Sequence, residues 1–411
     1  MAANPSIQLG TDGNWAIKED NLLAYKKDGT RFFNKEFDFT RNTTATFVDK
    51  DGLIKTVTSD IPRIDFTDDA TGHLLLEPQS TNLAIFSEDF SGYAWLVFGS
   101  IQANSSVSPN GLATATKLTS TGTQYHLVRI GFSGLATTSV FVKNVDANNF
   151  YIRKSNDDYA YYNFNTKTVS DNSLKVEHFA NDWVRLSLTT QATNYRQFGV
   201  GVNETDLSEV GNSVHIWGAQ VEQQSFATSY IPTQGSTVTR NADVCNNSGS
   251  AQDFNSEEGV LYAEIAALAN SGNKRRISLS DGTDLNGVIL SLPIPDDVIK
   301  ILIKSGGAIQ ANSTDTVVIT ATDFNKIAAK YKDNDFALWV DGTKVFTDSS
   351  GSVPIGLNEL SFNFNGGENF YGKTKDLKVF KRAMSDSELY LLTVPQYQSY
   401  QEMATALNYT L

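Results

Sequence analysis

The stretch DWVRLSLTT, residues 182–190, carries the pattern that decides the fold. Val184, Leu186 and Leu188 alternate with other residues, so an extended strand places these three side chains on one face and their neighbours on the other. The same period of two recurs in TTSVFVKN, residues 137–144. We expect one face of the resulting sheet to be buried and the opposite face to meet water.

Short apolar runs separated by turn residues continue along most of the chain. Asp341 and Gly342 lie between two apolar arms and predict a two-residue hairpin. Ser385 and Glu388 have the spacing of a capping box and predict the start of a short helix. We therefore predict an all-β protein with two antiparallel β-sandwich (jelly-roll) domains in tandem. An extended region of short strands precedes them, and a short helical tail follows.

The polar stretch NNSGSAQDFNSEEG, residues 246–259, has no periodicity and marks a domain boundary. The second domain is expected to fold alone over residues 250–393, because its strands follow one another in sequence. The predicted divisions are an N-terminal attachment or wrapping region at 1–85, a jelly roll at 86–245, a second sandwich at 246–394 and a tail helix at 395–411.

Composition and charge exclude several classes of partner. The chain has 46 acidic and 33 basic side chains and a formal charge of −13. A negatively charged protein does not attract the phosphate backbone as a whole, so we expect no nucleic-acid ligand. The single cysteine, Cys245, cannot close an intrachain disulfide. No stretch has the pattern of a signal peptide or a membrane span, so we expect a protein made in the cytoplasm that does not insert into membranes.

The side-chain patterns of common catalytic sites are missing from the sequence. Glycan hydrolysis needs two facing carboxyl groups, whereas the acidic residues here lie mostly in polar turns where water solvates them. The four histidines are scattered, and no nucleophile elbow or phosphate-binding loop occurs. We expect no enzyme activity, no catalytic residue and no cofactor.

Glycan binding without catalysis requires an aromatic ring for the C–H face of a sugar and polar groups for its hydroxyls. In NFYIRKSNDDYAYYNFN, residues 149–165, Tyr159, Tyr161 and Asn163 share one strand parity. Trp183 lies on the parity opposite the apolar residues of its strand. These four are the predicted glycan-binding residues. The alternative for both tyrosines is packing on a sheet surface or at a subunit contact.

Three stretches resemble modules that recur in tail and head-fibre proteins of tailed bacteriophages. The first is FTRNTTATFVDKDGLIKTV (residues 39–57) with IPRIDF (61–66), the second LLLEPQSTNLAIFSEDFSGYAW (74–95), and the third HIWGAQVEQQSFATSYIPTQGSTVTRNAD (215–243). In such proteins, the part corresponding to residues 88–243 is similar to a carbohydrate-binding-module jelly roll. The segment before it tends to lie near the point of attachment to the virion.

Residues 250–393 resemble the concanavalin A-like lectin and laminin-G sandwich, through residues 323–346 and 357–389. Some members of that family bind calcium at loop carboxylates. Asp281, Asp284 and Asp333 are carboxylates of a suitable type, but they do not make up a full ligand set. Their alternative role is that of solvated turn residues.

The resemblance implies a virion structural protein, a head or tail fibre or spike, that is assembled in the host cytoplasm. Its expected partners are other virion proteins of the capsid or tail, host cell-surface polysaccharide and two further copies of itself in a homotrimer. Two alternatives are open: a polysaccharide depolymerase of a tail spike, and a purely structural decoration without a ligand.

Overall fold

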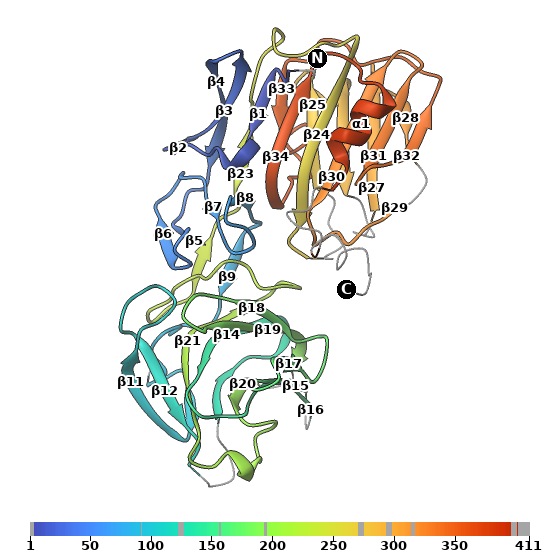
Figure 1. The fold of residues 1–411 in the computed structure, drawn as a ribbon. Helices are drawn as coiled ribbons and strands as arrows, with labels where there is room; N and C mark the ends of the chain where they lie inside the picture. Colours follow the sequence, from blue (N-terminus) through green and yellow to red (C-terminus); the bar gives the residue numbers. More distant parts are fainter. Residues whose placement is uncertain are drawn as a thin grey trace. The chain divides into compact units, whose positions relative to one another are not determined.

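The computed structural model describes residues 4–91, 93–121, 127–155, 158–192, 195–269, 275–292, 298–313, 317–395 and 401. The chain divides into two compact units, coloured along the sequence in Figure 1. Unit 1 comprises residues 1–39, 73–76 and 244–411, and unit 2 comprises residues 40–72 and 77–243. Antiparallel strands build the sheets of both units, which confirms the predicted all-β fold of β-sandwich domains.

Unit 1 contains two sheets. The strand order of the larger one is β23 (Val244–Asn246), β4 (Arg31–Thr40), β3 (Asn21–Asp28), β1 (Ile7–Leu9), β34 (Gly372–Phe380), β24 (Glu258–Ala267), β30 (Asn325–Lys332), β31 (Phe336–Val340) and β32 (Thr343–Asp348), with β2 (Ile17–Lys18) on β3 and β8 (His73–Leu76) on β34. The order of the smaller one is β28 (Ala308–Asn312), β27 (Val298–Ser305), β26 (Gly287–Leu292), β25 (Arg275–Ser280) and β33 (Glu359–Ser361), with β29 (Val317–Val318) on β27.

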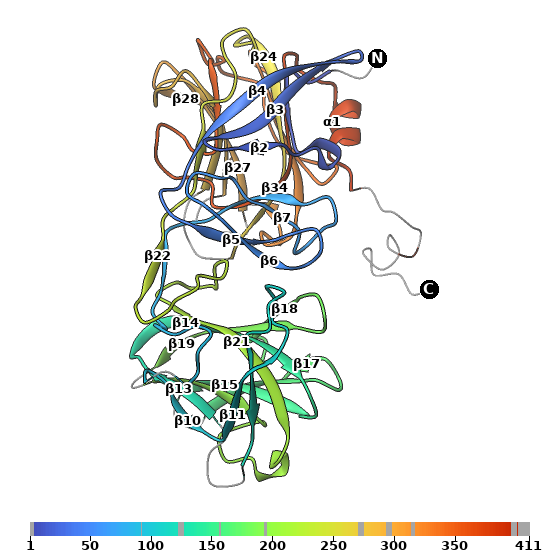
Figure 2. The ribbon, with the colours of Figure 1, turned by 90° about the vertical axis from the view of Figure 1, so that its left-hand side faces the viewer.

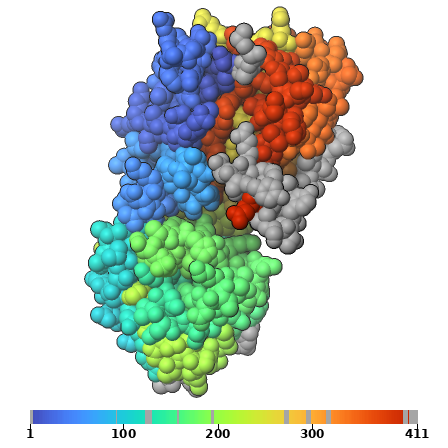
Figure 3. Space-filling view, viewed as in Figure 1, coloured from blue at the N-terminus to red at the C-terminus, as the bar shows by residue number. Residues whose placement is uncertain are grey.

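The start of the chain belongs to the larger sheet of unit 1. Ile7 pairs with Val379 and Leu9 with Leu377, so β1 lies along β34, and the one-turn 3-10 helix η1 (Thr11–Gly13) follows β1. Figure 3 shows the dark blue N-terminal residues on the surface beside the red C-terminal ones of the same unit. Residues 1–85 are thus divided between the two units, with residues 1–39 in the sheet of unit 1.

Two local predictions in unit 1 are confirmed. Asp341 and Gly342, both at positive φ, form the turn between β31 and β32. Helix α1 (Asp386–Thr393) begins with the capping box, in which the Ser385 hydroxyl accepts from the Glu388 amide and the Glu388 carboxylate accepts from the Ser385 amide. The helix packs on β30 and β31 and buries Leu389, so it covers the face of the larger sheet seen in Figure 1.

Unit 2 is a sandwich of two sheets with a continuous apolar core between them. The β15 sheet has the order β10 (Leu96–Phe98), β13 (Leu127–Gly131), β20 (Tyr195–Val200), β15 (Asn149–Ser155), β16 (Asp158–Asn163) and β17 (Thr168–Val169). The β14 sheet has the order β11 (Ser100–Ser106), β12 (Ala115–Thr119), β21 (Ser213–Glu222), β14 (Gly134–Asn144), β19 (Val184–Ala192) and β18 (Lys175–His178). The remaining elements are the pairs β5 (Ala45–Val48) with β6 (Ile54–Val57) and β9 (Ser80–Asn82) with β22 (Val238–Arg240), the strand β7 (Ile64–Asp65) and the 3-10 turn η2 (Leu207–Glu209).

The β14 sheet is buried on both faces, so the prediction that one face meets water is wrong. Val184, Leu186 and Leu188 face the sandwich core as expected. On the opposite face, Trp183 is only 1% exposed because a second apolar cluster covers it. The members of this cluster are Val48, Ile54, Ala115, Phe141, Trp183, Trp217 and Tyr230, with Phe179 packed against them. Two of them, Val48 and Ile54, come from the β5–β6 hairpin. The alternation of residues within one strand does not reveal that a separate hairpin covers the outer face of the sheet.

The predicted tail helix at 395–411 lies outside the described residues, except for Pro395 and Gln401. In the part of the chain that the structure describes, no helix has the length and apolarity needed to cross a membrane.

Candidate functional site

The outer face of the β15 sheet brings three of the four predicted glycan-binding residues together. Strands β15 and β16 pair with Tyr161 opposite Tyr151 and Asn163 opposite Asn149. Directly paired residues point to the same side of a sheet. The alternate residues, among them Phe150, Ile152, Ala160 and Tyr162, lie in the core. Tyr159, Tyr161 and Asn163 therefore lie on the face turned away from the core.

Buried side chains of neighbouring strands support this row of tyrosines. The ring of Tyr151 meets that of Tyr159 edge to face, with 5.3 Å between the centroids. Gln197 on β20 donates from Nε2 to the Tyr151 hydroxyl at 3.0 Å and to Glu204 Oε2 at 2.7 Å. The guanidinium of Arg153 lies 4.4 Å from the centroid of the Tyr195 ring. The result is a face of half-buried rings on a fixed polar base.

The buried Tyr151 hydroxyl beneath the tyrosine row has one protonation state at neutral pH. Burial, reinforced by the charge of Glu204, raises the pKa of Tyr151 well above its usual value, so its O–H is intact at neutral pH. The Gln197 Oε1 atom is buried and has no hydrogen-bond partner among the described residues. A buried acceptor without a partner is costly, and because Gln197 is closed to solvent this atom belongs to the buried layer beneath the tyrosines and is out of reach of a ligand.

An ionic cluster lies where β15 turns into β16. The ammonium of Lys154 is 2.5 Å from Asp171 Oδ2 and 3.3 Å from Asp158 Oδ2. The hydrogen bond from Lys154, with others from Ser173, holds the pKa of Asp171 well below its usual range. Asp158 is adjacent to Tyr159 in β16 and therefore has the opposite strand parity, so the cluster holds the strand end together and does not extend the tyrosine face.

Trp183 does not belong to this face. Its indole N–H donates to the Val107 carbonyl at 3.1 Å, and its ring is buried in the cluster that covers the β14 sheet. A sugar cannot stack on a ring whose faces are already covered. The parity that places Trp183 opposite Val184 is correct, but that parity faces a second core.

The three predicted calcium ligands are not assembled into one site. Asp281 accepts from the Thr283 amide at 2.9 Å and from Asn286 Nδ2 at 2.7 Å, as a turn residue does. Partial burial raises its pKa, but these hydrogen bonds outweigh burial and leave the pKa below the usual value. Asp284 is exposed on the same turn, and Asp333 accepts from the Val353 amide at 3.0 Å on another. Within the described ranges, no three His, Cys, Asp or Glu residues form a group that could hold a metal ion.

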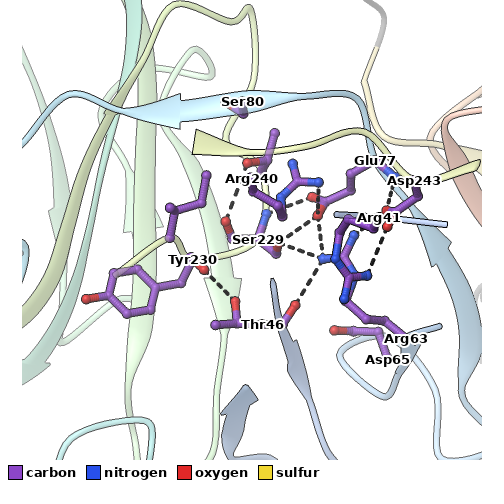
Figure 4. A network of polar contacts seen from close by, with 12 residues as sticks. Arg41, Thr46, Arg63, Asp65, Glu77, Ser80, Ser229, Tyr230, Arg240 and Asp243 are labelled. Atoms are coloured by element: carbon purple, nitrogen blue, oxygen red, sulfur yellow. Dashed lines mark hydrogen bonds and ion pairs between the residues drawn. The ribbon is translucent and has the colours of Figure 1, made fainter. Parts of the chain in front are cut away.

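A buried ionic network in unit 2 was not anticipated from the sequence (Figure 4). Asp243 accepts from Arg41 Nη1 at 3.1 Å and from Arg63 Nη2 at 2.5 Å. Glu77 accepts from Arg63 Nη1 at 2.7 Å, and Arg240 Nη1 lies 3.5 Å from the same carboxylate oxygen. All five side chains are almost completely closed to solvent. The network therefore holds the fold together and is no site for a ligand in solution.

The five charged residues of this network come from the three stretches that resemble phage fibre modules. Arg41 and Arg63 lie in the first, Glu77 in the second, and Arg240 and Asp243 in the third. The first two stretches are close together in the sequence, but more than a hundred residues separate the second from the third, which is why no local pattern indicates the network. The sequence alone could have indicated Tyr151 and Arg153, since they share the outward parity of β15. Gln197 joins them because β20 pairs with β15, and Glu204, which follows β20, joins them through its hydrogen bond with Gln197.

The fold and the tyrosine face define a β-sandwich protein of two units. Among known proteins, no family model matches the chain, and no curated protein matches it either. Several solved structures show weak likeness to the chain. The carbohydrate-binding module CBM40 of the Ruminococcus gnavus IT-sialidase, bound to α2,3-sialyllactose, has a TM-score of 0.30 at 16% identity, over 36% of this chain and 93% of that one.

Mouse laminin α1 domains LG4–5 have a TM-score of 0.23 at 8% identity, over 78% of this chain and 95% of that one. The Trypanosoma rangeli sialidase in complex with the inhibitor DANA has a TM-score of 0.27 at 10% identity, over 92% of this chain and 68% of that one. At such scores, these likenesses carry no argument about the function of the chain.

Proposed function

We propose that this chain is a structural protein of a bacteriophage virion, a head or tail fibre or spike, that displays its β-sandwich units for adhesion to host-surface polysaccharide. Its partners in this proposal are other virion proteins and further copies of itself in a homotrimer. The virion part is supported by the resemblance of residues 39–66, 74–95 and 215–243 to phage fibre modules.

The adhesion part is supported by one observation, the tyrosine face of the β15 sheet. Tyr159 and Tyr161 offer half-buried rings that carry phenol hydroxyls, on one side of a rigid sheet. Asn163 beside them holds the following turn, since its amide oxygen accepts from the backbone N–H groups of Asn165 and Thr166. A sugar needs such a combination of rings and hydroxyls because it has both an apolar C–H face and hydroxyl groups. Strand pairing holds the rings in place before a ligand arrives, which lowers the entropic cost of binding.

Binding of the purified full chain to a glycan array and to surface polysaccharide of the host tests the proposal. Tyr159→Ala and Tyr161→Ala should each weaken binding by about tenfold, which corresponds to about 1.4 kcal/mol. Tyr93→Ala is the matched control, since Tyr93 is a more exposed tyrosine of the same unit. Undiminished binding in both variants, or no binding by the native chain, would contradict adhesion through this face; the second result would favour a decoration without a ligand.

The depolymerase alternative has one specific observation in its favour. Glu264 and Asp376 are directly opposite each other on β24 and β34. Burial raises the pKa of both carboxyl groups, as a general acid requires. Asp376, however, is engaged by an ion pair with Lys378 and accepts from Thr11 Oγ1 at 2.7 Å. The adhesin proposal predicts that the native chain releases no reducing ends from host polysaccharide; release that Glu264→Gln abolishes would establish the depolymerase instead.

A further inference from the structure

The N-terminal hairpin of unit 1 exposes an unusual amount of apolar surface. Strands β3 and β4 run side by side in Figure 2 and pair along their whole length, from Asn21 with Asp38 to Asp28 with Arg31. Phe32 is 62% exposed and Phe33 is 46% exposed. Exposed apolar side chains gathered on one element mark an interaction site more often than isolated ones do.

A hollow of about 530 Å³ lies on this hairpin. The rings of Trp15, Tyr25 and Phe32 and the amides of Asn14 and Asn34 are part of its lining. Among the described residues of the lining, Tyr25 is the only one with an ionisable side chain. Its volume is within the range of about 300–1,000 Å³ that is typical of small-molecule sites. The hollow therefore suits an uncharged ligand with an apolar face and hydrogen-bonding groups.

The aromatic walls of the hollow are fixed by local structure. Gly10 has a φ of +73°, and a methyl group on it would lie 2.4 Å from the Trp15 ring, so the ring packs directly against the Gly10 backbone. The Tyr25 and Phe32 rings lie 5.4 Å apart between centroids. Burial raises the pKa of Tyr25, while hydrogen bonds with Asn14 and Thr11 act in the opposite direction. Its hydroxyl is therefore a neutral donor and acceptor at neutral pH.

A second, smaller hollow of about 250 Å³ adjoins the first, because Ala16 and Leu23 line both. Its lining adds the polar side chains of Lys18, Asn21 and Glu36. The Lys18 ammonium lies 3.6 Å from Glu36 Oε1. This ion pair balances the charge of the second hollow and offers both donors and acceptors to hydroxyl groups.

We infer that the two hollows form a binding site for a neutral oligosaccharide, with one sugar ring against the aromatic walls and the next beside the Lys18–Glu36 pair. An aromatic subsite followed by a polar, charge-balanced one matches the alternation of C–H faces and hydroxyl groups along such a chain. A phosphate or a polyanionic glycan would need free cations. Among the described lining residues the one lysine, Lys18, is paired with Glu36, and the Lys27 ammonium beside the hollow already lies over the Phe32 ring, 5.5 Å from its centroid. The inference does not rest on the proposed function, since the site lies in unit 1, on other strands than the tyrosine face.

Fluorine NMR of the full chain labelled with 5-fluorotryptophan tests this site directly. The chain has five tryptophans, and Trp15→Phe identifies the Trp15 resonance by its loss. The probes are neutral hexasaccharides: cellohexaose, N-acetylchitohexaose, mannohexaose and a β-galactohexaose. We expect at least one of them to shift the Trp15 resonance in a saturable way, with Phe32→Ala weakening that affinity by about tenfold or more.

Two controls separate this site from other effects. Ile309→Ala removes a side chain of unit 1 that is 60% exposed, as Phe32 is 62% exposed, and should leave the affinity unchanged. Tyr161→Ala should also leave the affinity of the hollow for the hexasaccharide unchanged, while it weakens adhesion through unit 2. Failure of the site in unit 1 can therefore be distinguished from failure of the tyrosine face. The inference is overturned if no hexasaccharide shifts the Trp15 resonance at millimolar concentration, or if Phe32→Ala binds as tightly as the native chain. It is also overturned if the molecular mass in solution is that of an oligomer that Phe32→Ala dissociates, because a second copy would then cover the hollow.

Discussion

The Arg63 guanidinium lies 2.7 Å from the carboxylate of Glu77, and both side chains are almost completely shielded from water. Breaking a buried pair by removing one partner is far more damaging than breaking an exposed one, because the other charge is left without compensation. Glu77 serves two cations, since Arg240 Nη1 lies 3.5 Å from the same oxygen. Its substitution therefore affects the frame of unit 2 as a whole.

We expect Glu77→Gln to lower the free energy of unfolding of unit 2 by about 3–5 kcal/mol. Glu36→Gln removes an exposed carboxylate that pairs with Lys18 at 3.6 Å and should cost less than about 1 kcal/mol. Urea denaturation followed by tryptophan fluorescence measures both changes. Equal denaturation midpoints for Glu77→Gln and the native chain would show that the network contributes nothing.

The same carboxylate predicts a pH dependence of stability. Burial works to raise the pKa of Glu77, but Arg240, Arg63 and hydrogen bonds from Ser229 outweigh it and lower the pKa from its usual 4.5 to about 2. A pKa depressed by folding contributes stability that is complete above the unfolded pKa and is lost as the pH falls toward the folded one. When the pH falls from about 6 to about 3, protonation of Glu77 should therefore lower the free energy of unfolding of the native chain by roughly 2 kcal/mol. Glu77→Gln lacks this carboxylate and should not show that loss.

Urea titrations of both proteins at these two pH values measure the difference. Burial raises the pKa of Glu264 and Asp376 in unit 1, which acts in the opposite direction as the pH falls. Both groups are present in the native chain and in the variant, so their effect cancels in the comparison. Parallel loss of stability in the two proteins would contradict the prediction.

Trp183→Ala should be strongly destabilising, because the ring is 1% exposed and packs with Phe141 and Trp217 in the cluster over the β14 sheet. Truncation of a buried tryptophan leaves a cavity and costs about 3–5 kcal/mol. Tyr161→Ala, at a half-buried position on the tyrosine face, should cost about 1 kcal/mol. Thermal unfolding of the two variants distinguishes the positions, and similar melting temperatures would refute the assignment of Trp183 to a core.

The fragment 250–393 lacks two strands that pair with β34. Residues 377–379 of β34 pair with β1 and residues 372–374 pair with β8, and neither partner is in the fragment. An unpaired strand edge is open to aggregation and loses the hydrogen bonds of the ladder. We expect a peptide of residues 4–28, which contains β1, to bind the fragment and raise its melting temperature by several degrees, about 4 °C or more.

The control for this experiment is the same peptide with Ile7→Asp and Leu9→Asp. Both residues are fully buried in unit 1, so the charged side chains should abolish the effect. A melting temperature that neither peptide changes would mean that residues 250–393 are complete without β1, as the sequence of strands alone suggests.

Local patterns in the sequence determine much of this protein. The alternation around Val140 and Leu186 gives β-strands with a core face, and the Asp341–Gly342 turn and the Ser385 cap are local hydrogen-bonding and backbone preferences. The shared parity of Tyr159 and Tyr161 follows for the same reason, since it depends only on the period of one strand.

Only the tertiary structure decides what meets each face and edge. Trp183 is buried because the distant β5–β6 hairpin covers its sheet, and β1 pairs with β34, which lies more than 350 residues further along the chain. Arg63 is acceptable in an apolar interior only because Glu77 and Asp243 arrive there from separate segments. Such contacts are set by the global packing of the chain, which must satisfy every buried charge and cover every apolar face at once.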